Sequence, residues 1–418
     1  MGGSRFEASG VWSRYVTVLT TVAGILLTAR YAYVAWARRA PADARYPYQN
    51  VVMTDFRDTA FLPVRALAAG VNPYDMGRYQ AMFPYAQEFN AYAPWWLSVC
   101  EVFRWLSWDD AALLGSTALA SATALLAVWS GRWIRMCVGD VRWGIALAPM
   151  MLCFVWFWRP TTLGHGLGNP GAVVALAAAG VLLSAGESWV GAALLAVAWL
   201  KPQFGLPLVL VLVLRRQWRT ALGGTMLAGA LSLPAVVRLS QVSGGFLPWV
   251  QQVLASTAEV AARTESEPLE GRIDLVGMLS RSGIAVPMAA AVVVALALLG
   301  LGIWADHAAT ARGLTWQGKL LLGGFLLIAT PHLHYDMALL APLVFASSLE
   351  LVVRPTFHYA KLEMLNLACP LLIAVGSLVP GQVFPTLPLY NAFLGIWLSF
   401  ALGVGLLTAL IVENRRSR

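Results

Sequence analysis

The chain has 418 residues, of which 59% are hydrophobic and 12% are charged, and its mean hydropathy is +0.66. Soluble domains carry roughly 25% charged residues, and one soluble core stops growing near ~250–300 residues, so this composition excludes a soluble enzyme, a disordered chain and a disulfide-stapled secreted domain. The net charge of +8 comes from cations in short connections between apolar runs. Because there is no contiguous basic stripe, we expect no nucleic-acid partner. We predict an all-α polytopic membrane protein that is embedded in the lipid bilayer.

Twelve apolar runs predict about 12 transmembrane helices. The runs fall at 15–37, 93–107, 110–130, 143–157, 165–185, 188–214, 219–239, 284–304, 318–331, 336–352, 364–379 and 389–411. Two long polar segments, 38–92 and 240–283, interrupt them. The polar start of the chain argues against a cleavable signal peptide. We expect one transmembrane domain over residues 1–418.

The positions of Lys and Arg predict how the chain is oriented. Short segments expected on one side of the membrane hold 12 Lys and Arg in 52 residues, whereas those expected on the other side hold 9 in 112. The first set comprises 1–14, 215–219, 305–319, 353–363 and 412–418, and the second comprises 38–91, 240–283, 331–335 and 380–388. The positive-inside rule therefore predicts cytoplasmic termini and places both long polar segments on the outer face of a bacterial cytoplasmic membrane.

Two arrangements of the spans remain open. The arginine-rich connection 131–142 is typical of a cytoplasmic loop, although counting the twelve runs in order places it outside. The alternative makes 93–107 a membrane-surface or re-entrant helix and splits 188–214 into two short spans at Lys201-Pro202. The total stays at 12 in both arrangements.

The first outer segment contains an acidic motif, Asp55-Phe56-Arg57-Asp58, directly before a stretch with apolar residues at helical spacing, 59–70. This stretch predicts a short amphipathic helix in the membrane interface. An acid at the mouth of such a segment suits a general base that acts on a membrane-bound substrate, whereas the simpler alternative is an acid that caps the helix. Asp58 is nearer to the helix and is the expected cap, which leaves Asp55 as the candidate base.

A second polar cluster, 329–336, separates two apolar runs and contains His332, His334, Tyr335 and Asp336. Ionisable side chains at membrane depth are costly, so they are functional candidates by default. The two histidines supply only two metal ligands and no third or fourth stands out, so we expect neither a metal nor another cofactor. Imidazoles that hold a phosphate or a sugar hydroxyl are the favoured interpretation.

Two further motifs lie inside apolar runs. Lys201-Pro202-Gln203 places a cation in mid-span, where it either pairs with an anionic substrate group or extends to one interface. The other motif, 164–170, holds His165 and Asn169 among glycines that let backbone approach a ligand. Three glycines at a helix boundary are a weak signal by themselves.

In their order along the chain these motifs resemble the GT-C superfamily of integral membrane glycosyltransferases, and in particular glycosyltransferase family 87. That family includes mannosyl- and arabinofuranosyltransferases of the actinobacterial cell envelope. The resemblance rests on Asp-Phe at 55–56, Gly-x-Asn-Pro-Tyr at 70–74, Tyr-x-Pro at 92–94, Lys-Pro-Gln at 201–203 and Pro-His-x-His-Tyr-Asp at 331–336. One motif departs from the family, because relatives often carry Gly-Gln with a nearby Asn where this chain has Gly164-His165 with Asn169.

The resemblance implies inverting, metal-independent transfer of mannose or arabinofuranose from a polyprenyl-phosphate donor to an envelope glycolipid or polysaccharide acceptor. The family's catalytic aspartate falls on Asp55, its histidine on His332 or His334, and its Lys-Pro motif on Lys201. The other residues expected to bind substrate are Arg57, Asp58, Tyr92, His165, Asn169, Gln203, Tyr335 and Asp336. In this interpretation the aspartate takes the acceptor proton and nearby cations stabilise the leaving phosphate.

Two alternatives to a glycosyltransferase remain. A transporter or flippase of a lipid-linked sugar needs charges that continue through the membrane, for which Arg30, Glu101, Arg104 and Arg159 are available. The chain shows no internal repeat of the kind that many transporters carry. A non-catalytic membrane subunit predicts that Asp55→Ala leaves activity intact. The candidate catalytic and binding residues are predicted to gather on one face of the membrane, which favours the enzyme over both alternatives.

Overall fold

The computed structural model describes residues 4–43, 52–86, 92–138, 144–184, 189–266, 272–311, 313–353, 360–378 and 387–416. Within these ranges every regular element is a helix, and strand-like pairing is limited to two isolated bridges. This confirms the all-helical class predicted from the apolar runs.

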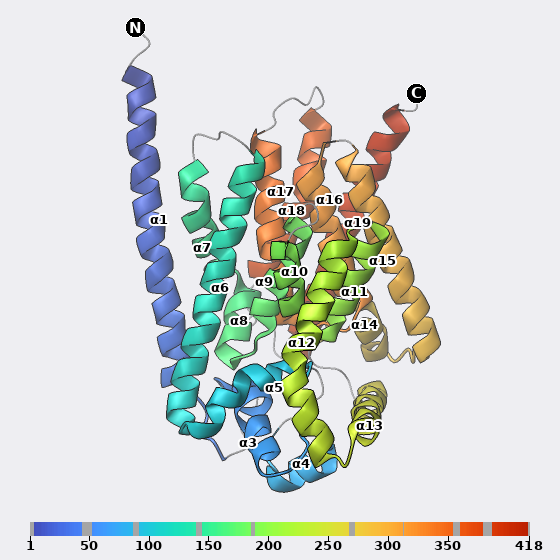
Figure 1. Ribbon diagram of the computed structural model, residues 1–418. Coiled ribbons are helices and arrows are strands. Elements are labelled where there is room, and N and C mark those ends of the chain that lie inside the picture. The colour runs from blue at the N-terminus through green and yellow to red at the C-terminus, as the bar shows by residue number, and fades with distance from the viewer. Residues whose placement is uncertain are drawn as a thin grey trace.

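A bundle of apolar helices forms the larger part of the molecule (Figure 1). Its helices are α1 (Ser4–Ala37), α6 (Trp108–Val138), α7 (Leu147–Phe157), α9 (Gly171–Leu183), α10 (Trp189–Ala198), α11 (Pro202–Leu214), α12 (Trp218–Val242), α15 (Met288–Thr310), α16 (Thr315–Ala329), α17 (Leu340–Val353), α18 (Ala360–Leu378) and α19 (Leu387–Arg416). Among the residues that the structure describes, four helices are long and apolar enough to cross a membrane: α1, α6, α12 and α15. The total of about 12 spans stays a prediction.

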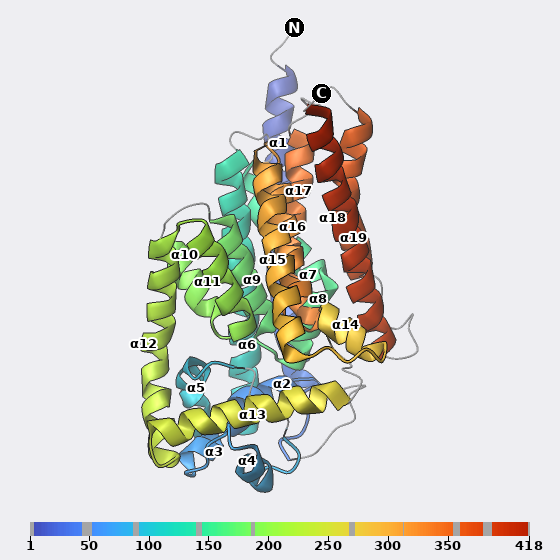
Figure 2. The same cartoon turned by 90° about the vertical axis from the view of Figure 1, so that its right-hand side faces the viewer.

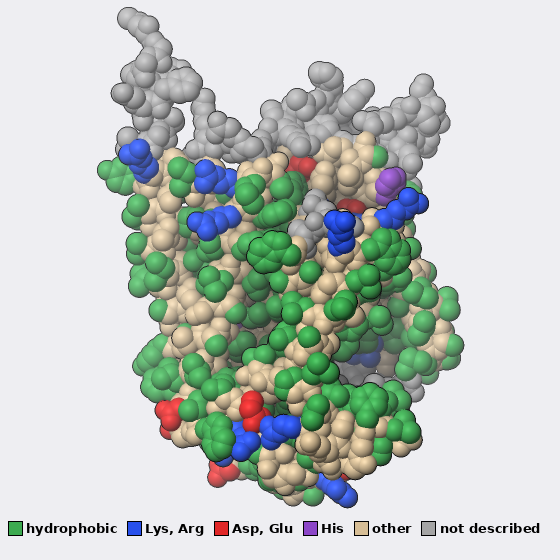
Figure 3. Space-filling model, in the orientation of Figure 1, with side chains coloured by type: hydrophobic (Ala, Val, Ile, Leu, Met, Phe, Trp, Pro, Cys, Tyr) green, Lys and Arg blue, Asp and Glu red, His purple; other side chains and the backbone are tan. Residues whose placement is uncertain are grey.

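The sides of this bundle have the surface of a protein that is solvated by lipid. Leu19 and Leu26 on α1 are 68% and 63% exposed, and Met226 on α12 is 72% exposed. On the face shown in Figure 3, charged side chains gather toward the two ends of the molecule, and the band between them is largely apolar. Such a belt is stable in hydrocarbon because helices satisfy their own backbone hydrogen bonds.

Two pairs of helices are each joined by a break inside the bundle, and the two helices of each pair pack against each other. α10 ends at Ala198 and α11 begins at Pro202, while α16 and α17 are separated by an irregular stretch and the short helix η4 (His334–Leu339). Proline has no N–H to continue a helix, and it stands at both breaks, as Pro202 and Pro331. Irregular backbone at membrane depth is tolerated where protein buries it. The breaks therefore bring polar residues into the interior.

A cap of helices, most of them short, covers one end of the bundle. It consists of α2 (Thr54–Phe56), η1 (Arg57–Phe61), α3 (Leu62–Ala68), α4 (Met76–Met82), α5 (Trp95–Cys100), η2 (Glu101–Trp105) and α13 (Phe246–Ser266). The remaining short helices are η3 (Gly144–Ala146), α8 (Arg159–Leu167) and α14 (Leu275–Arg281). The first turn of α1 and the last turn of α19 lie at the opposite end from the cap (Figures 1 and 2). The two long polar segments thus share one end, although the membrane orientation itself remains a prediction.

The helix boundaries support the second of the two span arrangements. The run 93–107 forms α5 and η2, of six and five residues, which reach about 19 Å against the ~30 Å of a bilayer's hydrocarbon. The run 188–214 is split into α10 and α11 at Lys201. A long span at 93–107 is therefore wrong, and α6 finishes at the same end of the molecule as the first turn of α1 and the last turn of α19 (Figure 1).

The helix expected at 59–70 starts earlier and packs into the protein. α2, η1 and α3 form a continuous helical stretch from Thr54 to Ala68, and all five residues of its π-helical turn, η1, are buried. Asp58 lies inside that turn, so the expectation that it caps the helix is wrong. Its buried carboxylate pairs with the guanidinium of Arg57 at 2.7 Å, because a buried charge needs an ionic partner more than a helix end needs a cap.

Candidate functional site

Asp55 stands where the cap meets the bundle. Met53, which precedes α2, adopts a left-handed conformation with φ of 65°, and its N–H donates to the carbonyl of Gly166 on α8 at 2.8 Å. This hydrogen bond fixes the start of α2 against α8. The side chain of Asp55 is partly exposed, in contrast to the buried Thr54 and Phe56 on either side.

Gly168 lets α8 approach α2 this closely. It ends α8 with φ of 71°, a left-handed conformation that glycine adopts without strain. A Cβ at this position would lie 2.6 Å from Cβ of Phe56 and 2.8 Å from the sulfur of Met53. The residue that follows, Asn169, is thereby placed beside the carboxylate of Asp55.

Asn169 connects Asp55 to the second polar cluster. Its Nδ2 donates to Oδ2 of Asp55 at 2.7 Å and to the hydroxyl of Tyr335 at 2.9 Å. Its Oδ1 accepts from the N–H of Gly171 at 2.7 Å. Because this oxygen is occupied by a backbone donor, the amide group is held with its nitrogen toward the carboxylate.

Lys201 and Asp336 form a buried ion pair between the two helix breaks. Nζ of Lys201 lies 3.0 Å from Oδ1 of Asp336, and these side chains are only 2% and 1% exposed. The other oxygen, Oδ2, is 3.1 Å from Nδ1 of His332 and accepts from the N–H of Leu333 at 3.2 Å. Nε2 of His332 is 3.0 Å from Oγ1 of Thr330. A buried pair is stable when its remaining hydrogen-bonding groups are satisfied in this way.

Aromatic rings surround this ion pair. The ammonium of Lys201 lies 4.6 Å from the ring centroid of Tyr335 and 5.9 Å from that of Tyr92. The backbone N–H of Ala93 donates to the carbonyl of Leu200 at 2.9 Å, which ties the start of α5 to the break before α11. Tyr92, which was expected to bind substrate, thereby lies beside the ion pair.

Gly171 lets two clusters lie in contact, the one that contains Asp55 and Asn169 and the one that contains Lys201 and Asp336. A Cβ there would lie 2.7 Å from Oδ1 of Asn169, 2.8 Å from Nζ of Lys201 and 2.9 Å from Oδ1 of Asp336. No other residue type fits without displacing these groups. Gly171 was not predicted as a site residue, although Asn-Pro-Gly at 169–171 is a recognisable turn signal.

The environment of Asp55 makes it a weak acid. Burial of the carboxyl against the surrounding protein raises its pKa from 3.8 to about 6, and the negative charge of Asp58 adds to this effect. The hydrogen bond from Asn169 and the charge of Lys201 act in the opposite direction. A carboxylate with such a pKa is mostly ionised at pH 7 and is a better proton acceptor than an ordinary aspartate.

Several predicted site residues lie outside this group. Arg57 and Asp58 pair with each other, and Arg57 also donates to the carbonyl of Pro41 at 3.1 Å. These contacts hold the cap together. His165 packs edge-on against Trp156, with ring centroids 5.4 Å apart, on the side of α8 that faces α1. Gln203 is partly exposed, and its carbonyl accepts a 3.4 Å hydrogen bond from Thr330.

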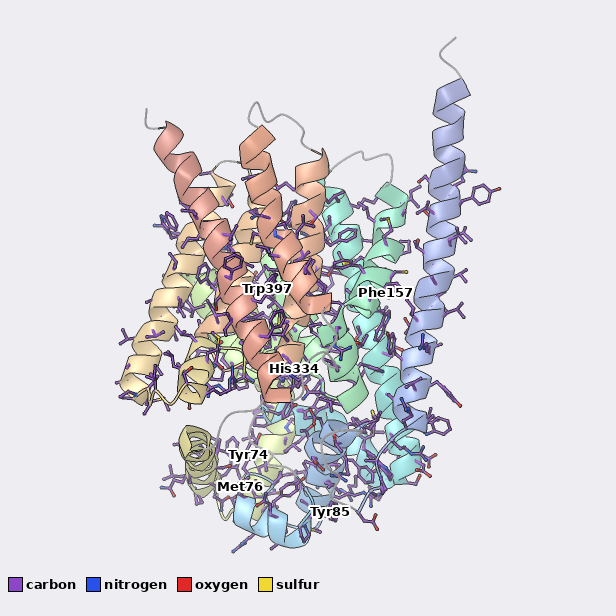
Figure 4. All side chains as sticks on the ribbon, turned by 180° about the vertical axis from the view of Figure 1, so that it is seen from behind. Tyr74, Met76, Tyr85, Phe157, His334 and Trp397 are labelled. Carbon is purple, nitrogen blue, oxygen red and sulfur yellow. The ribbon has the colours of Figure 1, made fainter. Side chains whose placement is uncertain are left out.

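His334 lies at the base of the bundle, above the cap residues Tyr74 and Met76 (Figure 4). It is buried, and its ring is 5.3 Å from that of Tyr335. Within the described residues, no group of three or more His, Cys, Asp or Glu is placed to hold a metal ion. The site thus combines one partly exposed carboxylate with a buried, hydrogen-bonded ion pair, at the junction of cap and bundle.

Comparison with known proteins identifies one family. The model of glycosyltransferase family 87 matches residues 90–331, which is more than half of the chain. This match includes Asn169, Lys201 and both helices that flank it, and it ends just before His332. Neither a curated protein nor a solved structure matches the chain.

Proposed function

The chain belongs to glycosyltransferase family 87, and from this premise we propose that it transfers mannose or arabinofuranose from a polyprenyl-phosphate donor. The acceptor is an envelope glycolipid or polysaccharide, and the transfer inverts the anomeric configuration. The cap, which lies at the end opposite to the termini (Figure 1), faces the outer side of a bacterial cytoplasmic membrane. A site between cap and bundle suits a substrate whose lipid stays in the bilayer while its sugar is in water.

The proposal rests on the partial exposure of Asp55, its hydrogen bond to Asn169 and its raised pKa. Its side chain is partly exposed, held at 2.7 Å by Asn169, and surrounded by protein that raises its pKa to about 6. In the proposed reaction Asp55 accepts the proton of the acceptor hydroxyl as its oxygen attacks the anomeric carbon. The bond from that carbon to the phosphate oxygen breaks on the opposite face, and its electrons leave with the lipid phosphate.

In this proposal a positioning role is assigned to Lys201, Asp336 and His332. Asp336 binds both Lys201 and His332, so neither side chain is free to bind the substrate phosphate directly. Their role is to fix the ring of Tyr335 beneath the ammonium and, through its hydroxyl, the amide of Asn169. Tyr92 and Tyr335 then offer ring surfaces to the sugar.

The transporter alternative has less support. Glu101, which it would use, pairs instead with Arg104 at 3.0 Å and with Arg238 at 2.6 Å. These partners join η2 to α12 at the cap. Local pairing of this kind stabilises the packing of short helices, so it is explained without any movement of charge through the membrane.

The test is transfer of label from radiolabelled polyprenyl-phosphate mannose or arabinofuranose to an envelope-lipid extract by purified protein, with EDTA present. We expect transfer by the wild type and a loss of at least ~10²-fold in Asp55→Asn, since general bases contribute about 10²–10⁴-fold. Asp110→Asn, at an exposed acid at the start of α6, is the matched control and should keep full activity. Full activity in Asp55→Asn would remove the base assignment, and failure to use either donor would remove the proposed donor class.

A further inference from the structure

An ion triad of Glu101, Arg104 and Arg238 lies at the side of the cap. Oε1 of Glu101 is 3.0 Å from Nη1 of Arg104, and Oε2 of Glu101 is 2.6 Å from Nη1 of Arg238. Glu101 and Arg104 belong to η2, whereas Arg238 lies near the end of α12. The triad therefore joins a short helix of the cap to a helix that is long and apolar enough to cross a membrane.

The triad carries one positive charge more than it carries negative charges. Its single carboxylate faces two guanidinium groups, and neither arginine pairs with a second acid in the described part of the chain. The two acids that follow η2 have other partners. Asp109 pairs with Arg39. The carboxylate of Asp110 accepts from the hydroxyl of Ser107.

Both guanidinium groups of the triad can bind a further anion. Arg104 donates to Glu101 through Nη1, and a guanidinium has five N–H donors in all. The side chains of Arg104 and Arg238 are each 32% exposed, and that of Glu101 is 34% exposed. An anion that approaches from outside the protein can therefore reach N–H donors that the carboxylate does not use.

The side chains around the triad are typical of a membrane surface. Trp105 is 75% exposed, and the guanidinium of Arg104 lies 4.1 Å from the centroid of its ring. Val102 on η2 and Val237, the neighbour of Arg238, are 50% and 53% exposed. Tryptophan gathers at the headgroup level of bilayers, and long arginine side chains extend from apolar surroundings to that level.

The triad also lies at the height at which lipid-exposed helices end. The last turn of α1 is level with α5 (Figure 1), and α5 leads directly into η2. Close to this height, α13 lies across the molecule (Figure 2), and Phe246 and Leu247 at its start are 61% and 65% exposed. On the face shown in Figure 3, acidic and basic side chains gather just below the apolar band. An anion at this level belongs to the surface of the bilayer.

We propose that Arg104 and Arg238, together with the ring of Trp105, bind the headgroup phosphate of an anionic phospholipid in the surrounding bilayer. Guanidinium groups bind phosphate oxygens through paired N–H donors. The phosphodiester of such a headgroup carries a single negative charge, which balances the excess charge of the triad. The indole of Trp105 packs beside the headgroup, and Glu101 competes with the phosphate for the two arginines.

The bound lipid would hold the reaction site at the membrane surface. α5 begins at Trp95, three residues after Tyr92, and leads to the triad. A headgroup bound to η2 and α12 therefore fixes the height of Tyr92 relative to the bilayer. This inference does not depend on which sugar is transferred or on which acceptor receives it.

The test measures which lipid lies beside η2. The purified protein is placed in nanodiscs that contain phosphatidylglycerol or phosphatidylcholine with a photoreactive diazirine near the glycerol, and cross-linked peptides are quantified after irradiation. We expect more cross-linking of 99–105 to phosphatidylglycerol than to phosphatidylcholine. Arg104→Gln and Arg238→Gln should each lower the phosphatidylglycerol yield about 5-fold, the contribution of one basic residue near an anionic membrane surface. Equal yields from the two lipids, or unchanged yields in both variants, would overturn the proposal.

Glu101→Gln distinguishes a lipid site from a contact that only packs helices. Removal of the competing carboxylate should raise the phosphatidylglycerol yield at 99–105, whereas a triad that serves packing alone gives no increase. Unchanged or lower yield in a Glu101→Gln protein that melts as the wild type does would overturn the proposal. Arg104→Lys and Arg238→Lys keep the charge and should keep most of the yield, which covers the case in which a glutamine variant fails to fold.

Two controls show that the effect is local. Arg78→Gln removes an arginine of α4 that is 76% exposed and lies beside Asp75, and it should leave cross-linking of 99–105 unchanged. Cross-linking of 131–138, a basic segment at the far end of α6, serves as the internal reference and should be equal in all variants. A parallel loss at both segments would show a general change in the protein and would refute a site at η2.

Competition identifies the source of the phosphate. Soluble glycerol phosphate at the concentration of the lipid should not reduce the cross-linking of phosphatidylglycerol, because it lacks the acyl chains that hold a lipid at this level. Displacement by glycerol phosphate would overturn the assignment to a lipid. Displacement by a small fraction of farnesyl phosphate would assign the site to the lipid-linked substrate and overturn the assignment to a bilayer phospholipid. Asp55→Asn should cross-link as the wild type does, because Asp55 is not part of this site.

Discussion

Gly171→Ala should impair the enzyme by at least ~10-fold in kcat/KM although it adds only one methyl group. The added Cβ would lie within 2.7–2.9 Å of Oδ1 of Asn169, Nζ of Lys201 and Oδ1 of Asp336. All three are polar atoms held by hydrogen bonds or by the buried ion pair, and none is the free end of a flexible apolar chain. The methyl group can therefore be accommodated only by lengthening the contacts that orient Asn169 toward Asp55.

The size of the effect follows from the packing. Overpacking of a close-packed interior costs about 1–3 kcal/mol, while glycine to alanine at an unstrained helical position gains roughly 0.5–1 kcal/mol. Gly171 is the first residue of α9 and does not have a positive φ, so only the steric part disfavours alanine. We expect a net destabilisation of about 1–2 kcal/mol and a loss in kcat/KM of at least ~10-fold, because 1.4 kcal/mol at the transition state already corresponds to that factor.

The assay compares Gly171→Ala with Gly166→Ala. Gly166 lies on α8, near the same site, but no atom lies within 4 Å of a Cβ added there, so its alanine variant should be fully active and as stable as the wild type or more so. Label transfer gives kcat/KM, and thermal melting in detergent gives the stability. Wild-type activity and melting temperature in Gly171→Ala would refute the close approach of the two clusters that underlies the proposed site.

Other predictions concern the charges of the site. If Asp55 is the base, kcat/KM should rise with pH around about 6 and level off above it; a profile flat from pH 5 to 8 would contradict this. Asn169→Ala removes a hydrogen bond that favours the ionised carboxyl, so the midpoint of that profile should move upward, and a downward shift would contradict the contact. Because the pKa of Asp55 is about 6 in the folded protein against an ordinary value of 3.8, the native state loses stability as the pH rises from about 4 to about 6, by up to about 3 kcal/mol at 1.36 kcal/mol per pH unit, and the loss is complete above that range; the stability of Asp55→Asn relative to the wild type should therefore be greater at pH 8 than at pH 4, and a difference in melting temperature that does not change with pH would contradict this. Lys201→Met leaves the carboxylate of Asp336 buried without its lysine partner, which should destabilise the protein by about 3–5 kcal/mol, and adding Asp336→Asn should recover part of this; a double variant no more stable than the single one would argue against the pair.

Much of the fold follows from hydropathy, because long apolar runs have no stable alternative to helices in a bilayer. The boundaries of the helices are harder to predict from hydropathy. The run 93–107 contains Glu101 and Arg104, and the run 188–214 contains Lys201-Pro202, so the sequence allows either a span or a break in each. Contacts with neighbouring segments decide that the first folds into two short helices of the cap and that the second breaks at Lys201. The hydrogen bond from Ala93 to Leu200 is one of these contacts, and no local pattern encodes it.

The site residues show the same division between local and distant information. Asp55 and the 331–336 motif could be selected from the sequence because ionisable groups at membrane depth are costly. Their partners could not be chosen, since Lys201 is 135 positions from Asp336 and Asn169 is 114 positions from Asp55. His165 was expected beside the substrate, but the sequence does not say which face of α8 turns toward α1. Asp58 was expected to cap a helix, but burial beside Arg57 decided its partner instead.

The position of Asp55 explains why these distant residues are needed together. A carboxylate at the edge of a membrane-embedded protein would be an ordinary, well-solvated acid if the cap were loose, and a protonated one if it were buried without partners. Here Asn169 keeps the group ionisable while the surrounding protein raises its pKa to about 6. The amide of Asn169 is in turn oriented by Gly171 and Tyr335, and the ring of Tyr335 lies beneath the ammonium of Lys201. The base strength of Asp55 is thus set by the two helix breaks, which is why substitutions there should alter the pH profile as well as the rate.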